Sequence, residues 1–267
     1  MTVDLYNHAY GKYELPVYHE IREETYGHDL GQTSWVSRDE SEEIAGALKL
    51  DARSYVLEIG CGSGRYALKI VEDVGCRIVG VDLNESGIRN AELLAAASGL
   101  NGKASFRLCD VSKGIAFADA AFDAAFSNDV LCHIPGRLAV LREMARVLRP
   151  GARLLFSDAL VIGGLISHDE VAARSSVGYY VFSPPGENER LLEEAGFRLL
   201  NATDTTENAA RIAQRWHDAR AKRREALIAA ENNSNFEGLQ RFLSTVYSLA
   251  RERRLLRYVY LAQKLSL

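Results

Sequence analysis

The chain has 267 residues, of which 47% are hydrophobic and 25% are charged, and its net charge is −4. This composition is typical of a globular protein and excludes a disordered or low-complexity chain. The acidic balance gives no electrostatic reason to expect a nucleic-acid partner, because proteins that coat phosphate groups are usually basic.

Cysteine spacing and hydropathy exclude three further classes. The four cysteines are scattered and never have Cys-x-x-Cys spacing, and the histidines other than His133 show no paired spacing with cysteines or carboxylates, so no metal site is expected. The first residues do not resemble a signal peptide, and no stretch approaches the roughly 18 apolar residues of a membrane-spanning helix. We therefore expect a soluble, cytoplasmic protein with free thiols and no membrane contact.

Short apolar runs alternate with helical patterns through the middle of the chain. Strands are expected at residues 54–59, 77–81, 104–108, 122–127 and 153–156, with helices at 65–73, 85–97 and 138–148. Towards the C-terminus the pattern predicts helices at 185–195, 207–231 and 235–251 and strands at 197–202 and 256–262. Strands that alternate with helices indicate a parallel sheet covered by helices on both faces.

The chain divides by pattern into four parts. We expect an N-terminal helical lid at residues 1–46, a core at 47–206, a helical lid insertion at 207–253 and the last strand of the core at 254–267. The first part holds five of the twelve tyrosines. These aromatic side chains either pack the lid or contact a ligand.

A glycine-rich turn, Gly60-Cys61-Gly62-Ser63-Gly64, follows the first strand and precedes a helix. Glycines let the backbone approach a ligand closely, and the helix N-terminus favours a negative group. A nicotinamide fingerprint would need glycine at its sixth position, where Arg65 stands, so that interpretation is disfavoured.

Polar side chains end the next strands. Asp82, about 20 residues after the glycines, suits the diol of a ribose. Asp110 can accept a hydrogen bond from an adenine amino group, and Val111 can pack on the ring. The fourth strand ends in Asn128 and Asp129. Four strands that end in polar residues in this order indicate a nucleoside-binding site more specifically than a glycine loop alone.

With these motifs the chain resembles the class I S-adenosylmethionine-dependent methyltransferases, over roughly residues 56–159. The resemblance implies an α/β fold, a doubly wound, mostly parallel seven-stranded sheet of Rossmann-like type with a helical lid. It implies S-adenosylmethionine as cofactor, with the loop facing its methionine part, Glu58 its amino group, Asp82 its ribose and Asp110 its adenine. The residues assigned to the cofactor are Ser34, Glu58, Gly60, Cys61, Gly62, Asp82, Leu83, Asp110, Val111 and Asn128.

Asp129 and His133 are four residues apart, so on a helical turn both would point towards the methyl donor. The segment resembles small-molecule enzymes, the phosphoethanolamine and sarcosine/dimethylglycine N-methyltransferases and the sugar O-methyltransferases of natural-product pathways. In the phosphoethanolamine group the histidine pairs with an N-terminal tyrosine, which this resemblance places at Tyr10. It also assigns Tyr18 and Tyr180 to the acceptor, and the resemblance to the sugar O-methyltransferases adds Asp158. Arg174 and Gly178 stand where that group has phosphate-binding residues, which disfavours a phosphorylated acceptor.

We therefore predict a methyltransferase that acts on a small-molecule acceptor, with His133 as general base. Asp129 would orient His133 or attract an ammonium group, which favours an amine nitrogen as the acceptor atom. O-methylation of a sugar or phenol and C-methylation of a quinone-like acceptor stay open as alternatives. So do a non-catalytic cofactor-binding module and a nucleic-acid methyltransferase, although the fourth strand lacks the Asn/Asp-Pro-Pro-Tyr motif of base N-methylation.

Overall fold

The computed structural model describes residues 3–266 and contains a seven-stranded sheet with the order β3-β2-β1-β4-β5-β7-β6. The strands are β1 (Tyr55–Ile59), β2 (Arg77–Asp82), β3 (Ala104–Leu108), β4 (Phe122–Ser127), β5 (Leu148–Ile162), β6 (Phe197–Asp204) and β7 (Leu255–Lys264). Strands β1 to β5 pair in parallel, and β7 runs antiparallel to both β5 and β6. The predicted fold class, a mostly parallel seven-stranded sheet, is confirmed.

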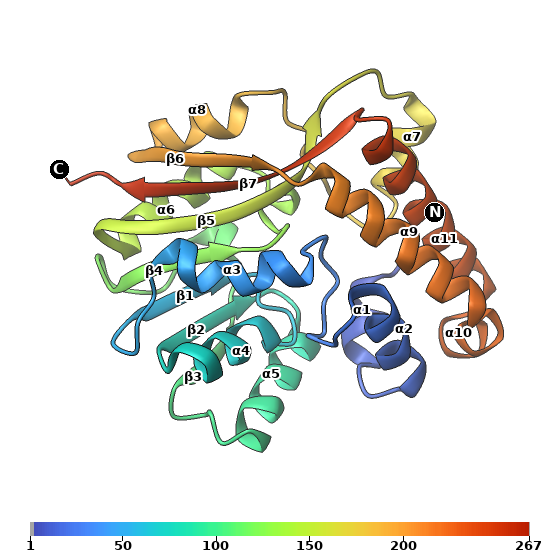
Figure 1. Ribbon diagram of the computed structural model, residues 1–267, viewed down its shortest axis with the longest axis horizontal. Helices are drawn as coiled ribbons and strands as arrows, with labels where there is room; N and C mark the ends of the chain where they lie inside the picture. Colours follow the sequence, from blue (N-terminus) through green and yellow to red (C-terminus); the bar gives the residue numbers. More distant parts are fainter. Residues whose placement is uncertain (1–2, 267) are drawn as a thin grey trace.

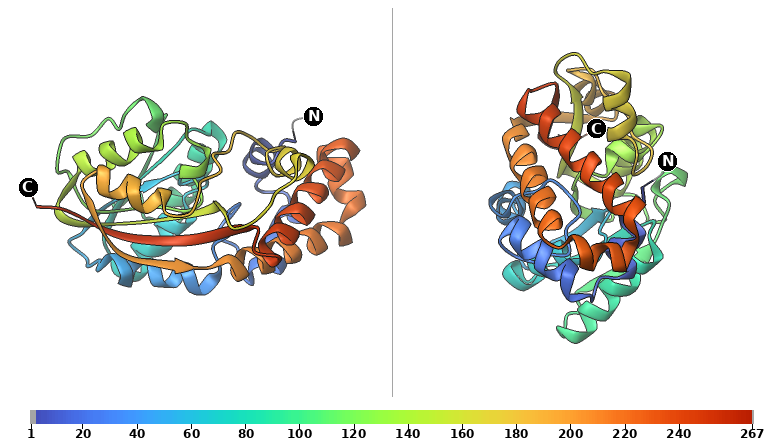
Figure 2. Two further views of the ribbon diagram at one scale, coloured as in Figure 1. Left: turned by 90° about the horizontal axis from the view of Figure 1, so that it is seen from above. Right: turned by 90° about the vertical axis from the view of Figure 1, so that its right-hand side faces the viewer.

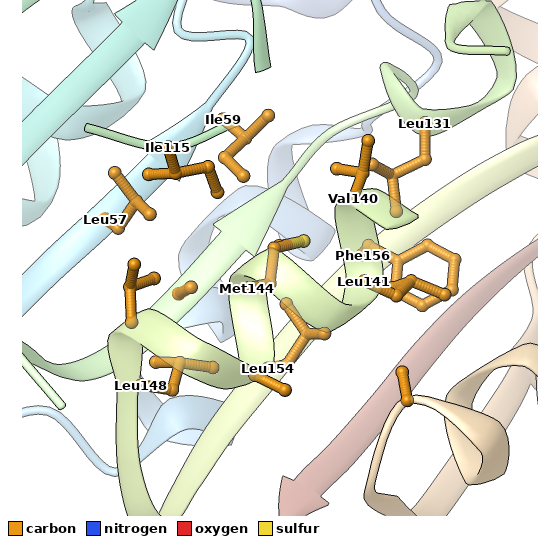
Figure 3. Close-up of a cluster of buried hydrophobic side chains, with 14 of the residues drawn as sticks. Leu57, Ile59, Ile115, Leu131, Val140, Leu141, Met144, Leu148, Leu154 and Phe156 are labelled. Carbon is orange, nitrogen blue, oxygen red and sulfur yellow. The ribbon is translucent and has the colours of Figure 1, made fainter. Parts of the chain in front are cut away.

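Helices cover both faces of the sheet. One face packs against α6 (Arg137–Val147) and α8 (Glu187–Glu194), where Leu141 and Met144 meet the strand residues Leu57 and Leu154 (Figure 3). The other face packs against α3 (Arg38–Leu48), α4 (Arg65–Val74) and α5 (Glu85–Ala97). The strands in between are buried on both sides, which explains their near-continuous apolar runs.

A second group of helices lies beyond the carboxyl ends of the parallel strands (Figures 1 and 2). It consists of α1 (Tyr6–Gly11), α2 (Pro16–Tyr26), α9 (Thr206–Lys222), α10 (Arg224–Glu231) and α11 (Asn233–Arg251), and we call these five helices the cap. Trp35, which lies between α2 and α3 in the chain, packs on α9 and α11. Its ring centre is 6.0 Å from that of Trp216 and 6.1 Å from that of Phe242. The N-terminal segment and the insertion before β7 therefore share one apolar core.

The structure differs from the expected elements in three places. The helix expected at 207–231 is broken at Arg223, so α9 and α10 are separate helices. Strand β5 extends well beyond residues 153–156, and a short helix, α7 (His168–Arg174), follows it. Of the segment 1–46, α3 packs on the sheet rather than in the cap. None of the helices within residues 3–266 is long and apolar enough to cross a membrane.

Candidate active site

The glycine turn lies at the carboxyl end of β1, whose two neighbours, β2 and β4, extend the sheet in opposite directions. The backbone φ values are +76° at Gly60, +51° at Gly62 and +74° at Gly64, a region that residues with a Cβ rarely adopt. A Cβ on Gly60 would lie 2.1 Å from Val130 Cγ2, and one on Gly62 would lie 2.5 Å from the Tyr10 hydroxyl oxygen. The turn therefore needs glycine for both its backbone conformation and its close neighbours.

A cavity of about 630 Å³ lies between this turn and the N-terminal part of the cap. All the residues that the sequence assigns to the cofactor line it, except Glu58. The catalytic candidates His133, Asp129 and Tyr10 line it as well. Crevices at the carboxyl ends of strands beside such a reversal of strand order are the usual ligand sites of open α/β sheets.

Asp82 connects the glycine turn to the end of β2. Its carboxylate accepts hydrogen bonds of 2.8 Å from the backbone amides of Gly62 and Asn84. Burial raises the pKa of the Asp82 carboxyl, and the two amide donors oppose this effect. The side chain thus presents a carboxylate edge to the cavity at a fixed place, as recognition of a diol requires.

Replacing Asp82 by alanine should weaken S-adenosylmethionine binding. Loss of a hydrogen bond to a charged group costs about 1.5–3 kcal/mol, which corresponds to a roughly 10- to 100-fold higher Kd. Isothermal titration calorimetry measures this directly. Asp119→Ala, at an exposed carboxylate paired with Arg146, is the control. An unchanged Kd for Asp82→Ala would contradict the ribose assignment.

The far end of the cavity is suited to a flat ring. Leu83 is 69% exposed although it is apolar, and it lines the cavity together with the buried Val111. Asp110 is held by Ser112 and by Lys113, whose ammonium lies 3.0 Å from the carboxylate. An apolar wall beside a fixed carboxylate matches the predicted adenine site.

Two buried polar groups beneath the turn have atoms without partners. Glu58 is 1% exposed, and its Oε2 has no hydrogen-bond partner among the described residues. Burial, followed by the charge of Asp82, raises the pKa of Glu58 well above its usual range. Glu58 is thus a second layer behind the cavity wall, which corrects the direct contact expected for it. Asn128, whose Nδ2 also has no partner within residues 3–266, does line the cavity.

His133 has its two ring nitrogens in different environments. Nδ1 lies 3.1 Å from the Tyr179 carbonyl oxygen, and Nε2 lies 3.1 Å from the Tyr6 hydroxyl. Because a carbonyl only accepts, Nδ1 carries the proton and Nε2 is the free base. Burial, and after it the charge of Arg174, lowers the pKa of His133 to about 4. The ring is therefore neutral near pH 7.

The tyrosine that pairs with His133 is Tyr6, not Tyr10 as expected. The Tyr10 hydroxyl instead lies 3.0 Å from Thr33 Oγ1 and faces Gly62, so Tyr10 covers the glycine turn. Both tyrosines lie on α1 with a spacing of four, and their rings stack 6.5 Å apart. The resemblance therefore pointed to the wrong member of a pair that lies one helical turn apart.

Asp129 does not contact His133. Its carboxylate accepts hydrogen bonds from the Trp35 amide at 2.8 Å, Ser157 Oγ at 2.9 Å and Arg257 Nε at 2.9 Å. Its backbone has a φ of +57°, and the helical turn begins only at Leu131, so residues 129 and 133 do not share a helix face. The expected role of Asp129 in orienting His133 is therefore wrong.

The three residues assigned to the acceptor are not among the described residues that line the cavity. Tyr18 is packed in the apolar core of the cap. Asp158 is fully buried within β5 and paired with Arg137 at 2.7 Å. Tyr180 packs against the His133 ring at a tilt of 42°, with 4.3 Å between the ring centres, so it supports His133 from outside the cavity.

Sequence reasoning missed part of the wall. Tyr6, Asn7, Gln32, Thr33 and Tyr66 line the cavity, and the hydroxyl of Tyr66 lies 3.2 Å from the oxygen of the predicted residue Ser34. Most of these residues come from the segment before β1. No strand pattern there indicates which side chains reach the cavity.

Residues 57–156 match the family model described as a methyltransferase domain. The chain is 34% identical over 170 residues to the O-methyltransferase resE of Aspergillus sclerotiorum, covering 63% of this chain and 64% of that protein. It thus spans less than two thirds of that protein. It is 30% identical over 166 residues to the O-methyltransferase rstn1 of Aspergillus nomiae, covering 61% of this chain and 73% of that protein.

The chain belongs to the S-adenosylmethionine-dependent methyltransferases. Among solved structures, this methyltransferase resembles the phosphoethanolamine N-methyltransferase 2 of Haemonchus contortus with a TM-score of 0.80 at 19% identity. The match covers 97% of this chain and 60% of the other, and it concerns the fold alone. The relatives thus include proteins named for oxygen and for nitrogen methylation.

Proposed function

We propose that this methyltransferase moves the methyl group of S-adenosylmethionine to a hydroxyl oxygen of a small acceptor, with His133 as general base. The observation that carries the proposal is the neutral His133 ring in the cavity wall. Its Nε2 is unprotonated and faces the Tyr6 hydroxyl, while Nδ1–H is held by the Tyr179 carbonyl. A base that is neutral at working pH and placed in the cavity is what deprotonation of a hydroxyl requires.

The cavity suits the cofactor. Its volume is about 630 Å³, which leaves room for a ring beside the ribose and the amino acid group. The Asp82 carboxylate suits the ribose. The side-chain-free turn and the unpartnered Asn128 amide suit the amino acid group. Bound S-adenosylmethionine supplies a methyl group on a positively charged sulfur, which needs no further activation. The task of the chain is to align the acceptor, exclude water and take up one proton.

The charges near His133 favour a hydroxyl over an ammonium. Asp129 already accepts hydrogen bonds from Arg257 and from two further donors, so its carboxylate is engaged within the protein rather than presented to an ammonium group. Arg174 adds positive charge on the far side of Tyr180. In this field an acceptor that arrives neutral is stabilised relative to one that arrives as a cation.

The proton balance of the step is simple. The oxygen–carbon bond forms as the carbon–sulfur bond breaks, and His133 Nε2 accepts the hydroxyl proton. The Tyr6 hydroxyl stands where the acceptor hydroxyl would bind to Nε2. Displacement of Tyr6 on α1 therefore accompanies acceptor binding.

Methylation of an amine is the second candidate, and aromatic rings favour it. Tyr6 and Tyr180 flank His133, with ring centres 5.7 Å and 4.3 Å from the imidazole, and Tyr10 stacks on Tyr6. Aromatic faces stabilise cations by about 0.5–2 kcal/mol each. They would partly offset the lack of a free carboxylate.

Transfer of labelled methyl groups to matched panels of phenol, sugar and amine acceptors separates the candidates. We expect labelling of hydroxyls and a kcat about 100-fold lower in His133→Gln, at the low end of the usual contribution of a general base. His168→Gln, at an exposed histidine at the start of α7, is the control. Labelling of amines alone would support the second candidate. Cofactor binding without transfer to any panel would support a binding module.

A further inference from the structure

Arg174 is a buried cation without a counter-ion. It ends α7, is 1% exposed and forms no ion pair with any residue from 3 to 266. Its Nη1 has no hydrogen-bond partner among these residues. The other buried arginines among the described residues behave differently, because each is paired with a carboxylate: Arg22, Arg137, Arg220 and Arg257.

Three aromatic rings surround the guanidinium. The Cζ atom lies 4.4 Å from the ring centre of Tyr180, 5.1 Å from that of Phe242 and 5.9 Å from that of Trp35. Such faces attract a cation but do not neutralise it. The positive charge therefore acts on the neighbouring groups at nearly full strength in a region from which water is excluded.

The ring of Tyr180 separates this charge from His133. Arg174 lies on Tyr180 at 4.4 Å, and Tyr180 packs on the imidazole with 4.3 Å between ring centres. Because Tyr179 and Tyr180 are adjacent, the same segment also supplies the carbonyl that binds Nδ1. Arg174 thus reaches the imidazole through Tyr180.

The other groups that face His133 do not cancel this charge. Tyr6 from α1 and Cys132 from the same turn are neutral, because burial raises the pKa values of both. The charge of Asp129 opposes that of Arg174 at His133 but has the smaller effect, and Arg257 from β7 pairs with Asp129 at an Nε–O distance of 2.9 Å as well as with Glu40. A proton on His133 would therefore meet more positive than negative charge.

We propose that Arg174 is a positioning residue that acts through Tyr180 to keep His133 uncharged and fixed in the cavity wall. A buried, unpaired charge costs stability, so its presence behind the base is explained by this effect on the imidazole. The inference rests on the proposed function only where it concerns the rate of methyl transfer. Its electrostatic part concerns the protein without any ligand.

The first test is an NMR titration of the histidines in the ligand-free protein. His133 is assigned by the signal that disappears in His133→Gln. In Arg174→Met and Arg174→Gln, which remove the charge, the pKa of His133 should rise by roughly one unit. In Arg174→Lys, which keeps the charge but loses the flat guanidinium, it should stay close to the wild-type value of about 4.

Thermal unfolding of the same variants checks the packing. Two neutral variants are used, so that the test survives if one of them does not fold. An equal rise of the His133 pKa in Arg174→Met, Arg174→Gln and Arg174→Lys would show that Arg174 acts through packing and would overturn the proposal. No rise in either neutral variant would overturn it as well.

The second test is the pH dependence of kcat/KM with a labelled hydroxyl acceptor. A higher pKa leaves more His133 protonated at a given pH, so the acid limb should move to higher pH in the neutral variants and not in Arg174→Lys. If the NMR pKa moves but no protein transfers methyl groups, the electrostatic inference holds and the proposed function fails. If methyl transfer occurs but neither the NMR pKa of His133 nor the acid limb of kcat/KM moves, the proposed function holds and the electrostatic inference fails.

Discussion

Replacing Gly60 by alanine should raise the Kd for S-adenosylmethionine roughly 1,000-fold, because the strain of about 1–2 kcal/mol adds to a displacement that alone costs about 100-fold. The strain arises because the φ of +76° at Gly60 is unfavourable for any residue with a Cβ. The displacement arises because the new methyl group would lie 2.1 Å and 2.8 Å from the two methyl groups of Val130.

The overlap at Gly60 forces movement in the cavity itself. Val130 and Gly60 both line it, so either the glycine turn or the segment between β4 and His133 must shift. The sheet below has no part in this overlap, and the variant should stay folded. Equilibrium dialysis with labelled cofactor measures the loss of affinity, and circular dichroism measures the fold.

Two variants control the Gly60 experiment. Gly46→Ala adds the same methyl group in helix α3, where nothing lies within 4 Å, and it should leave affinity unchanged. Removing the two methyl groups of Val130 in Gly60→Ala/Val130→Ala relieves the overlap but not the strain, and should restore part of the affinity. If Gly60→Ala bound the cofactor as well as the wild type, the turn would not be a binding surface.

Most of the residues assigned to the cofactor could be found from the sequence and do line the cavity. Apart from Ser34, which precedes β1, these lining residues end or follow a buried strand, and parallel strands bring their carboxyl ends to one edge. The position of Asp82 or Asp110 in the chain therefore determines its position in space. Glu58 differs because it lies within β1, a strand that is buried on both faces, and not after it.

The acceptor half could not be predicted in this way. Its walls come from α1, from the turn after β4 and from the segment after α7, which are far apart in the sequence. Whether Tyr6 or Tyr10 reaches His133 depends on how α1 docks on the sheet edge, and a short match cannot decide between two tyrosines one turn apart. The expected link from Asp129 to His133 failed for a local reason. The left-handed backbone at Asp129 interrupts the helical geometry that the spacing assumed.

Asp129 therefore has a different role, which leads to a second large effect. Replacing it by alanine should lower the free energy of unfolding by about 3–5 kcal/mol, since it removes the partner of a buried charge. Arg257 is 1% exposed and would keep only Glu40 as its acidic partner. Ser157 Oγ and the Trp35 amide would each lose an acceptor as well. Urea unfolding measures the change.

The double variant Asp129→Ala/Arg257→Met separates the pair from its surroundings. It removes both charges, so it should recover a substantial part of the stability lost in the single variant. Glu42→Ala breaks an exposed pair with Arg38 on α3 and should leave unfolding essentially unchanged. If Asp129→Ala were as stable as this control, the buried pair would contribute nothing to the fold.

The cofactor affinity of the Asp129 variants completes the argument. The Trp35 ring packs on α9 of the cap, and its backbone amide donates a hydrogen bond to Asp129, which follows β4. Breaking that hydrogen bond should loosen the cap over the cavity and weaken cofactor binding in the single and the double variant alike. Stability would then depend on the balance of charge between Asp129 and Arg257, and affinity on the carboxylate alone. If affinity instead recovered together with stability, Asp129 would hold the cavity in shape only through its partner on β7.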